Sequence, residues 1–525
     1  MNSFVSTFRK ISPSVFVLAA IFIIGIFLRT FYFHDWLRFN ADQSRDAGIV
    51  SDVVEGKTPA PLLGPKAGGT EFRLGSAFYI FQIASASLFG NRPDTMAYPD
   101  LISSLLAIPL LYAFLRLYFE RKTALFLTAL FAVSFYGVKY SRFAWNPNSL
   151  PFWTLLFFFS LHRLLAFPEK AGVVWSIILG VALGVGVQLH TLTLILFPIA
   201  AALTFGYLAF LRRERLGRVF LVVSTVAVLL NAGQILSEIR TGGENLSAFF
   251  SGIDAKEEKG SGFSKNIVKD SVCFVQGSVY ILTSHEISDT CDTKSIRNGS
   301  NGIFFAGGIL LFFGGIALAF RAFYREREAS KRYFLIINMA FLLLSFLLFI
   351  PLANEISMRF FLVTVFLPFI LLGLWFNLFV EVFPRWAFVG IAAISSILIL
   401  ANVYAVQQSF SEYASYLDKH SEAGMDNVLL REVEEAADFI VSRSGDSNTV
   451  SLGGDSRYLF KALKSIRYFT EKQGIDIIQQ KNGKTDTFPQ FIVDNTKHAD
   501  DFLKENPDVI DWKTIGRFTL FQVRR

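Results

Sequence analysis

The chain of 525 residues is too apolar for a soluble protein of its length. Hydrophobic residues make up 52 % of it, charged residues only 18 %, 58 positions are Phe, and the mean hydropathy is +0.44. Such a composition is typical of a protein that crosses a membrane many times. The net charge of +7 does not indicate nucleic acid as a partner, because Lys and Arg fall in short clusters between apolar runs, where they orient a protein in the bilayer.

Apolar runs long enough to cross a bilayer recur along most of the chain. A helix needs roughly 20 apolar residues for this. We therefore predict a polytopic α-helical membrane protein with about eleven transmembrane helices. The first is kept as a helix and not cleaved as a signal peptide, because it is long and no small-residue cleavage site follows it. The predicted spans lie near 13–33, 99–118, 122–139, 149–167, 171–188, 191–211, 217–236, 302–322, 333–353, 358–380 and 385–405.

A dense cluster of acids and bases follows the first span directly. Within residues 39–47 it contains Asp42, Arg45 and Asp46. Charges at such a place can face an aqueous cavity while a lipid substrate arrives from the side. We therefore place the candidate chemistry here; the alternative is a solvated loop with no role.

The rest of segment 34–98 has the pattern of two short helices lying along the membrane surface. They flank a bend rich in Pro and Gly. Lys66 and Arg73 add positive charge close to the lipid boundary. A cationic edge of this kind suits a lipid phosphate.

The short loops set the predicted orientation. If the spans alternate, the clusters of Lys and Arg between them all fall on one side, which the positive-inside rule makes cytoplasmic. Segments 34–98 and 237–301 and everything after about residue 406 then lie outside the cytoplasm. The expected location is a bacterial-type inner membrane or a plasma membrane.

Only two cysteines are present, Cys273 and Cys291, and both fall in the external segment 237–301. An oxidising compartment would let them form a disulfide. Two unpaired thiols remain the alternative, since spacing does not fix the distance between the Cα atoms. His285 and Glu286 form an isolated pair and no metal-ligand pattern.

The composition changes after about residue 406. Residues 1–405 form the predicted transmembrane module, and 406–525 form a small external α/β domain with helices near 428–441 and 457–473 and strands near 448–452, 491–493 and 518–523. No P-loop, zinc pattern or nucleophile elbow occurs in it. We expect this domain to cover the external cavity or to hold an acceptor.

This organisation resembles the GT-C glycosyltransferases, in particular the bacterial branch of the protein mannosyltransferase superfamily that includes the aminoarabinose transferase modifying lipid A. The local resemblance is between residues 42–47 (Asp-Gln-Ser-Arg-Asp-Ala) and a family pattern of Asp-Glu, any residue, Arg, Tyr, Ala. The Pro-rich turn at 59–65, Leu88-Phe89-Gly90 and Tyr98-Pro99-Asp100 occupy the places of later family features. The resemblance covers roughly the first 400 residues and implies the GT-C fold.

The resemblance implies a reaction at the cell envelope. Such enzymes take a hexosyl or pentosyl group from a polyprenyl-phosphate carrier on the non-cytoplasmic face, and transfer it with inversion to a lipid, glycan or protein acceptor. Asp42 matches the catalytic acidic residue and would be the general base, with Asp46 in reserve. Arg45, Lys66 and Arg73 are nearby cations that could stabilise the leaving phosphate.

The sequence departs from the family pattern at three places. Leu74-Gly75 stands where the family has a Pro-Pro step after the turn. Gln43 takes the place of the second acidic residue, and Asn146 and Asn148 stand where relatives often carry an Asp before a Pro-Leu step. Asparagines can orient a sugar but cannot act as a base. A divalent cation stays open as a cofactor, although a metal-assisted or two-carboxylate mechanism is disfavoured.

Three further residues are predicted at the external edge. Gln188 and His190 fall in a very short turn between two spans, with Gln188 as a candidate ligand of the sugar or acceptor and His190 of the donor. Arg359 opens the tenth span, where relatives often carry an Arg-Tyr or His-Tyr pair. We favour phosphate binding for Arg359 over anchoring in the headgroup region, because ionisable groups at this depth are costly.

Two other classes of function compete with an enzyme. A secondary transporter should show an internal repeat and charges near the middle of its spans, and neither is found. A non-catalytic protein that binds the carrier lipid is the harder alternative to exclude. The sequence identifies neither the sugar nor the acceptor, because the residues that select them are scattered.

Overall fold

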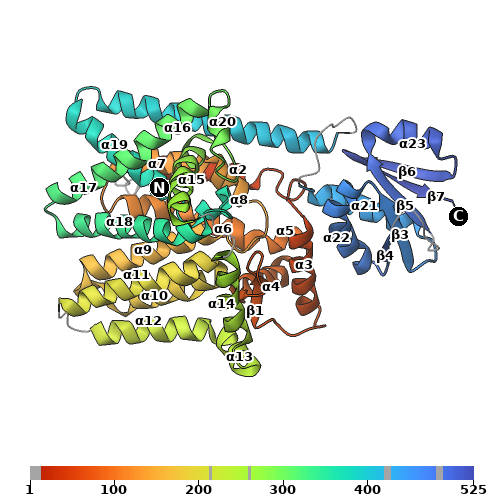
Figure 1. Cartoon of the computed structure of the whole chain (residues 1–525), viewed down its shortest axis with the longest axis horizontal. Helices are drawn as coiled ribbons and strands as arrows, with labels where there is room; N and C mark the ends of the chain where they lie inside the picture. Colours follow the sequence, from red (N-terminus) through yellow and green to blue (C-terminus); the bar gives the residue numbers. More distant parts are fainter. Residues whose placement is uncertain (1–12, 212–215, 258–261, 419–426, 481–488, 525) are drawn as a thin grey trace, which may run out of the picture.

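The chain forms a bundle of helices and, at its C-terminal end, a five-stranded sheet with helices (Figure 1). The computed structural model describes residues 13–211, 216–257, 262–418, 427–480 and 489–524. The long helix α20 (Ala387–Tyr416) extends from the bundle toward the sheet. It continues past residue 405, where the change of composition indicated a boundary.

Among the described residues, seven helical stretches are long and apolar enough to cross a membrane, and an eighth candidate is a pair bent by 63°. Every one of the eleven predicted runs is largely helical. The seven are α2 (Pro13–Thr30), α6 (Tyr98–Leu115), α10 (Pro168–Leu189), α11 (Thr191–Phe210), α16 to α17 (Asn301–Arg325), α18 (Ala329–Phe349) and α20; the bent pair is α12 (Leu216–Leu230) with α13 (Ala232–Thr241); the shorter apolar helices are α4 (Ala77–Phe89), α9 (Leu150–Ala166) and α19 (Leu367–Val382).

Besides the bent pair α12 and α13, two further predicted spans differ in detail from the structure. The run 122–139 is divided into α7 (Arg121–Val133) and α8 (Phe135–Tyr140) at Ser134, whose hydroxyl donates to the carbonyl of Ile281 at 2.9 Å. The run 358–380 begins as a 3-10 turn, and α19 starts only at Leu367. Apolar composition does not reveal such breaks, because they depend on contacts between segments.

Segment 237–301 is more ordered than a loop. After α14 (Glu244–Glu257) it contains α15 (Phe263–Thr283), whose second half is buried in the bundle. α15 was not predicted from the sequence, because its first turns are polar. Cys273 on α15 and Cys291 form a disulfide, with their Cα atoms 5.1 Å apart.

Segment 34–98 folds as two helices around a hairpin. α3 (Ala41–Val54) and α4 are the two short helices expected there, and β1 (Leu63–Lys66) pairs antiparallel with β2 (Arg73–Gly75) between them. The short helix α5 (Pro93–Met96) then leads into α6.

The C-terminal unit is a mixed sheet in the order β4-β3-β5-β7-β6. The central strand β3 (Thr449–Gly454) runs parallel to β4 (Asp476–Gln479) and to β5 (Gln490–Asn495), while β7 (Phe518–Val523) is antiparallel to β5 and to β6 (Val509–Ile515). α21 (Leu430–Arg443), α22 (Ser456–Lys472), β3, β5 and β7 match the predicted elements. Three elements were not predicted, because they carry fewer buried residues: β4, β6 and α23 (Ala499–Glu505).

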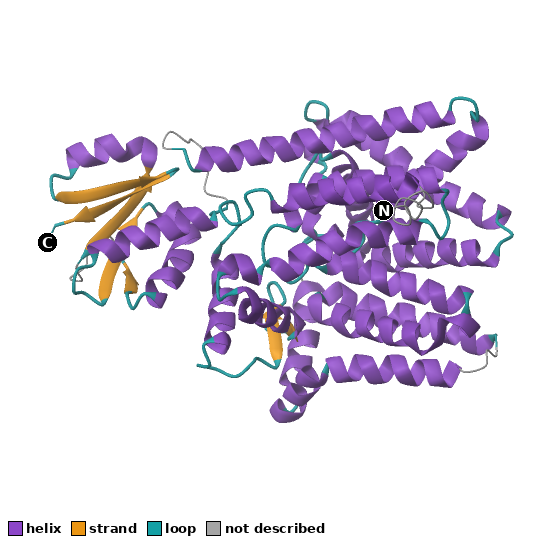
Figure 2. Ribbon diagram, turned by 180° about the vertical axis from the view of Figure 1, so that it is seen from behind, coloured by secondary structure: helices purple, strands orange, loops and turns teal. Residues whose placement is uncertain are grey.

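The C-terminal unit is bonded to the segment before α3. The Phe39 N–H donates to the Val428 carbonyl and the Leu430 N–H to the Leu37 carbonyl, both at 2.8 Å. Ser465 on α22 donates its hydroxyl to the Phe39 carbonyl at 2.7 Å. α21 and α22 lie on the side of the sheet that faces the bundle (Figure 2). The start of α3 is therefore held by elements nearly 400 residues away.

Candidate active site at the start of α3

The first turn of α3 carries the acidic residue singled out from the sequence. Asn40 precedes the helix, and its N–H donates to the Gln43 side-chain oxygen at 3.2 Å, one half of a capping box. The Asn40 side-chain oxygen accepts from the Val428 N–H at 2.9 Å, so the cap also joins the C-terminal unit. Asp42 follows in the first turn, where the helix dipole favours negative charge.

Asp42, Arg45 and Asp46 form one ionic cluster. Arg45 donates from Nη1 to Asp42 at 3.1 Å, and from Nε and Nη2 to the two oxygens of Asp46 at 2.9 and 3.1 Å. Tyr79 on α4 donates its hydroxyl to Asp46 at 2.8 Å. The Asp42 side chain is 64 % exposed, whereas Asp46 is buried. Asp42 can thus reach a substrate, and Asp46 holds Arg45.

Burial changes the acidity of Asp46. Desolvation raises its pKa to about 6, although Arg45 and the Tyr79 hydroxyl favour the ionised form. Asp46 is therefore ionised at neutral pH and loses its charge in mildly acidic conditions.

A further cation near Asp42, Arg38, was missed from the sequence. Its side chain is largely buried, with the guanidinium 5.0 Å from the centre of the Phe143 ring, and burial lowers its pKa. Asp42 raises that pKa and Arg359 lowers it, so both charges act on Arg38. The Arg38 Nε atom has no hydrogen-bond partner in the described part of the chain. The only available signal was its position four residues before Asp42.

Arg359 reaches the same region from the distant part of the chain. It is exposed, and its guanidinium lies 5.6 Å from the centre of the Trp145 ring. The Asp100 carboxylate accepts from the Trp145 N–H at 3.0 Å and so fixes this support. Arg359 lies near enough to Arg38 to lower the pKa of Arg38, and an anion bound near both guanidinium groups would offset the repulsion between them.

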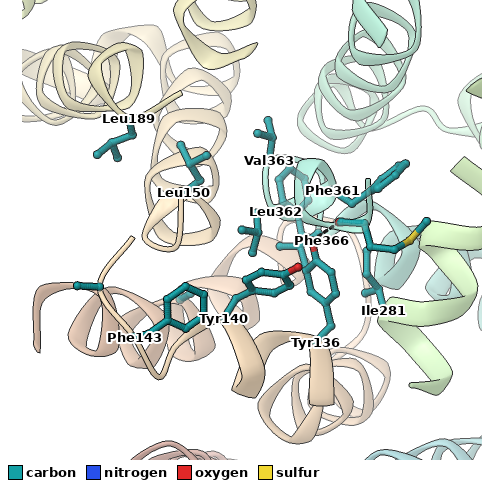
Figure 3. Close-up of a cluster of buried hydrophobic side chains, with 14 of the residues drawn as sticks. Tyr136, Tyr140, Phe143, Leu150, Leu189, Ile281, Phe361, Leu362, Val363 and Phe366 are labelled. Atoms are coloured by element: carbon teal, nitrogen blue, oxygen red, sulfur yellow. Dashed lines mark hydrogen bonds between the residues drawn. The ribbon is translucent and has the colours of Figure 1, made fainter. Parts of the chain in front are cut away.

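The segment that carries Arg359 is anchored in the apolar core. Residues Phe361, Leu362 and Phe366 lie in one buried cluster with Tyr136 (Figure 3). The Tyr136 hydroxyl donates to the carbonyl of Met358 at 2.8 Å. This packing holds the 3-10 turn in place, so Arg359 projects from a fixed base.

Asp42 and Arg38 line a cavity of about 820 Å³. Its other walls come from β3, α22 and the end of β4 in the C-terminal unit. Pockets of this size commonly hold small molecules. The cavity therefore lies between Asp42, the predicted general base, and the C-terminal unit, which we expected to cover an external cavity.

The predicted donor residues are not all brought together. Lys66 pairs with Glu71 on the hairpin, and Arg73 is joined there through its backbone to Asn245. Arg73 is near enough to Tyr79 to affect it electrostatically. Arg45, the third predicted cation, is already occupied by its two carboxylates. Among the described cations, Arg38 is one whose pKa Arg359 affects.

The four polar residues predicted near the turns form hydrogen bonds with backbone groups. Gln188 is buried; its side-chain oxygen accepts from the Ala77 N–H at 3.1 Å, and its amide donates to two carbonyls at 2.8 and 3.0 Å. Asn146 donates to the Leu189 carbonyl at 2.7 Å and Asn148 to the Phe143 carbonyl at 2.8 Å. The His190 ring accepts from the Leu192 N–H at 3.1 Å and caps α11. These contacts give each residue a structural role.

The residues around Asp42 do not fit a divalent cation. No group of three or more His, Cys, Asp or Glu side chains that could hold a metal occurs among the described residues. Both carboxylates of the cluster are already neutralised by Arg45. We derive no catalytic step through a metal.

This chain is similar to known proteins in part of its sequence and in its fold. Residues 76–234 match the family model of dolichyl-phosphate-mannose-protein mannosyltransferase. ArnT from Cupriavidus metallidurans in the apo state is similar in structure over 97 % of both chains, with 11 % sequence identity and a TM-score of 0.50. The chain has the GT-C fold of ArnT. This confirms the resemblance and the fold class predicted from the sequence.

Two other structures show weaker likeness. ArnT bound to undecaprenyl phosphate aligns over 97 % of both chains at 13 % identity, with a TM-score of 0.46. The S. cerevisiae Pmt1-Pmt2 complex bound to the sugar donor aligns over 45 % of this chain and 34 % of that chain, at 15 % identity and a TM-score of 0.34. A search of curated proteins found no match. The comparisons therefore show the GT-C fold, together with a family match over residues 76–234.

Proposed function

We propose that this protein transfers a sugar from a polyprenyl-phosphate carrier to an acceptor hydroxyl on the non-cytoplasmic face, with inversion. Asp42 acts as the general base, and Arg38 and Arg359 hold the carrier phosphate. The observation that carries the proposal is the placement of Asp42 on the cavity wall beside the half-buried Arg38.

The mechanism needs only this chain's own groups. Asp42 takes the proton of the acceptor hydroxyl as its oxygen attacks the sugar carbon. The bond to the carrier phosphate breaks, and negative charge builds on that phosphate. Arg38 and Arg359 would stabilise this charge, and they need no rearrangement because both are held by aromatic rings.

The proposed side of catalysis rests on the arrangement of the loops. The basic connections between α9 and α10 and between α17 and α18 lie at the end of the bundle away from the C-terminal unit (Figure 1). By the positive-inside rule the end with α3 is then external. A polyprenyl carrier would reach Asp42 from the bilayer at that end.

A direct experiment tests the activity. Purified protein in lipid nanodiscs is incubated with a panel of radiolabelled polyprenyl-phosphate sugars and with membranes as acceptor, and the Asp42→Asn variant is the matched control. We expect transfer from one donor by the wild type and none by the variant. Absence of transfer with every donor, together with donor binding, would instead favour a non-catalytic carrier-binding protein.

A further inference from the structure

The cavity beside Asp42 has a second wall built entirely by the C-terminal unit. Its residues lie at the carboxyl ends of the parallel strands β3 and β4, the place where open α/β sheets bind ligands, and along the first half of α22. They include Gly453, Gly454, Phe460, Lys461, Lys464 and Gln480.

The charge on this cavity is predominantly positive. Arg38, Lys461 and Lys464 line it, whereas Asp42 is the only acidic residue among the lining residues. Neither lysine forms an ion pair with another described residue, and Lys464 is exposed. The Arg38 Nε atom is buried without a hydrogen-bond partner in the described structure. Such a surface attracts an anion.

The remaining lining suits a sugar. Phe460 is 77 % exposed and lines the cavity, where it offers an aromatic face to a ligand. The Gln480 amide is held by a hydrogen bond to the Ser451 hydroxyl at 3.1 Å. A Cβ atom at Gly453 would collide with the side-chain oxygen of Gln480, so backbone forms this part of the wall. Aromatic, amide and backbone groups together are what a polar ring with hydroxyls needs.

We propose that this cavity binds the acceptor and that the acceptor is an anionic saccharide. Lys461 and Lys464 contact its phosphate or carboxylate groups, Phe460 lies against a sugar ring, and an acceptor hydroxyl is placed at Asp42. This inference rests on the proposed function, because it takes Asp42 as the base. An acidic protein segment is the competing acceptor.

Binding can be measured without turnover. The full-length protein in nanodiscs is titrated with glucose 1,6-bisphosphate and with uncharged maltose, followed by saturation-transfer NMR. We expect the bisphosphate to bind better than maltose, and Lys461→Ala with Lys464→Ala to weaken it by about fivefold to tenfold. Lys504→Ala is the control, since Lys504 is exposed on α23 and pairs with Asp501 away from the cavity. Unchanged affinity in the double variant, or equal binding of maltose, would overturn the inference.

Transfer supplies the second test. With the active donor and an envelope fraction, the double variant should raise the acceptor KM by about fivefold or more and change kcat less. Labelled product in either the organic lipid extract or the aqueous polysaccharide supports an anionic saccharide, and the two fractions distinguish a lipid-borne from a free one. Label on protein overturns it. If no donor is turned over, the proposed function fails while the titration still reports on the cavity.

Discussion

Arg45 donates from Nη1 to the Asp42 carboxylate at 3.1 Å, one turn away on the same face of α3. Its other nitrogens are held by Asp46. The Arg45 guanidinium therefore orients Asp42 and is itself held in place by Asp46. Arg45 is a positioning residue in this arrangement, and the proposed mechanism assigns the carrier phosphate to Arg38 and Arg359.

Replacing Asp42 with Asn should remove transfer and leave the fold intact. The side chain is exposed and contributes basicity and not packing, so turnover should fall about a hundredfold or more. Single-turnover rates and unfolding temperature check this. Asp52→Asn, an exposed carboxylate further along α3, is the matched control and should keep full turnover. Wild-type turnover by Asp42→Asn would remove the base assignment.

Transfer should fall as the pH drops through about 6. Above that pH Asp46 is ionised and holds Arg45; below it the carboxyl is protonated, because burial raises its pKa, and Arg45 loses its support. Tyr79→Phe removes a hydrogen bond to the ionised form, so the acidic limb should move to higher pH. The pH dependence of kcat is the measurement. If the acidic limb stays at the same pH in both Tyr79→Phe and Asp46→Asn, a group other than Asp46 causes it.

Arg38 and Arg359 should affect turnover more than donor affinity. Charge builds on the carrier phosphate as its bond to the sugar breaks, so removing either guanidinium should slow the single-turnover rate by about a hundredfold. Lys variants keep the charge without the planar fork and should be intermediate. Losses in stability alone, with unchanged single-turnover rates, would mean that the two arginines only anchor their segments.

The C-terminal unit should depend on one buried ion pair. Arg517 and Glu432 are both fully buried, with Nε to Oε1 at 2.9 Å and Nη2 to Oε2 at 2.6 Å. Arg517→Ala leaves the carboxylate buried and unpaired, which should cost about 3–5 kcal/mol. Hydrogen exchange on the full chain would show faster exchange in β5 and β7. Arg443→Ala, which removes an exposed pair with Asp511, is the control and should change exchange little.

The orientation can be tested by fusion. A reporter that is active only outside the cytoplasm should be active after Arg525 and silent after Arg327, because the basic loops predict that residues 406–525 are external. The reverse pattern would invert the topology and move the proposed site to the other face.

The sequence alone was sufficient for the membrane class, the apolar runs and the GT-C fold. These depend on composition and on local patterns, which act over a few turns of helix. It also predicted the cluster around Asp42, because a group of charges that follows a span directly is recognisable from the order of residues. The predicted strands β3, β5 and β7 were found for the same reason, since each is a short apolar run.

The tertiary structure alone decided which charges meet. Arg45 and Arg38 both lie within four residues of Asp42, and only the fold shows that Arg45 is used by two carboxylates while Arg38 shares a region with Arg359. The hydrogen bonds of Gln188 and the position of Lys461 on the cavity wall were hidden for the same physical reason. A hydrogen bond or a cavity wall depends on atoms brought together from hundreds of residues apart, and no local pattern records that distance.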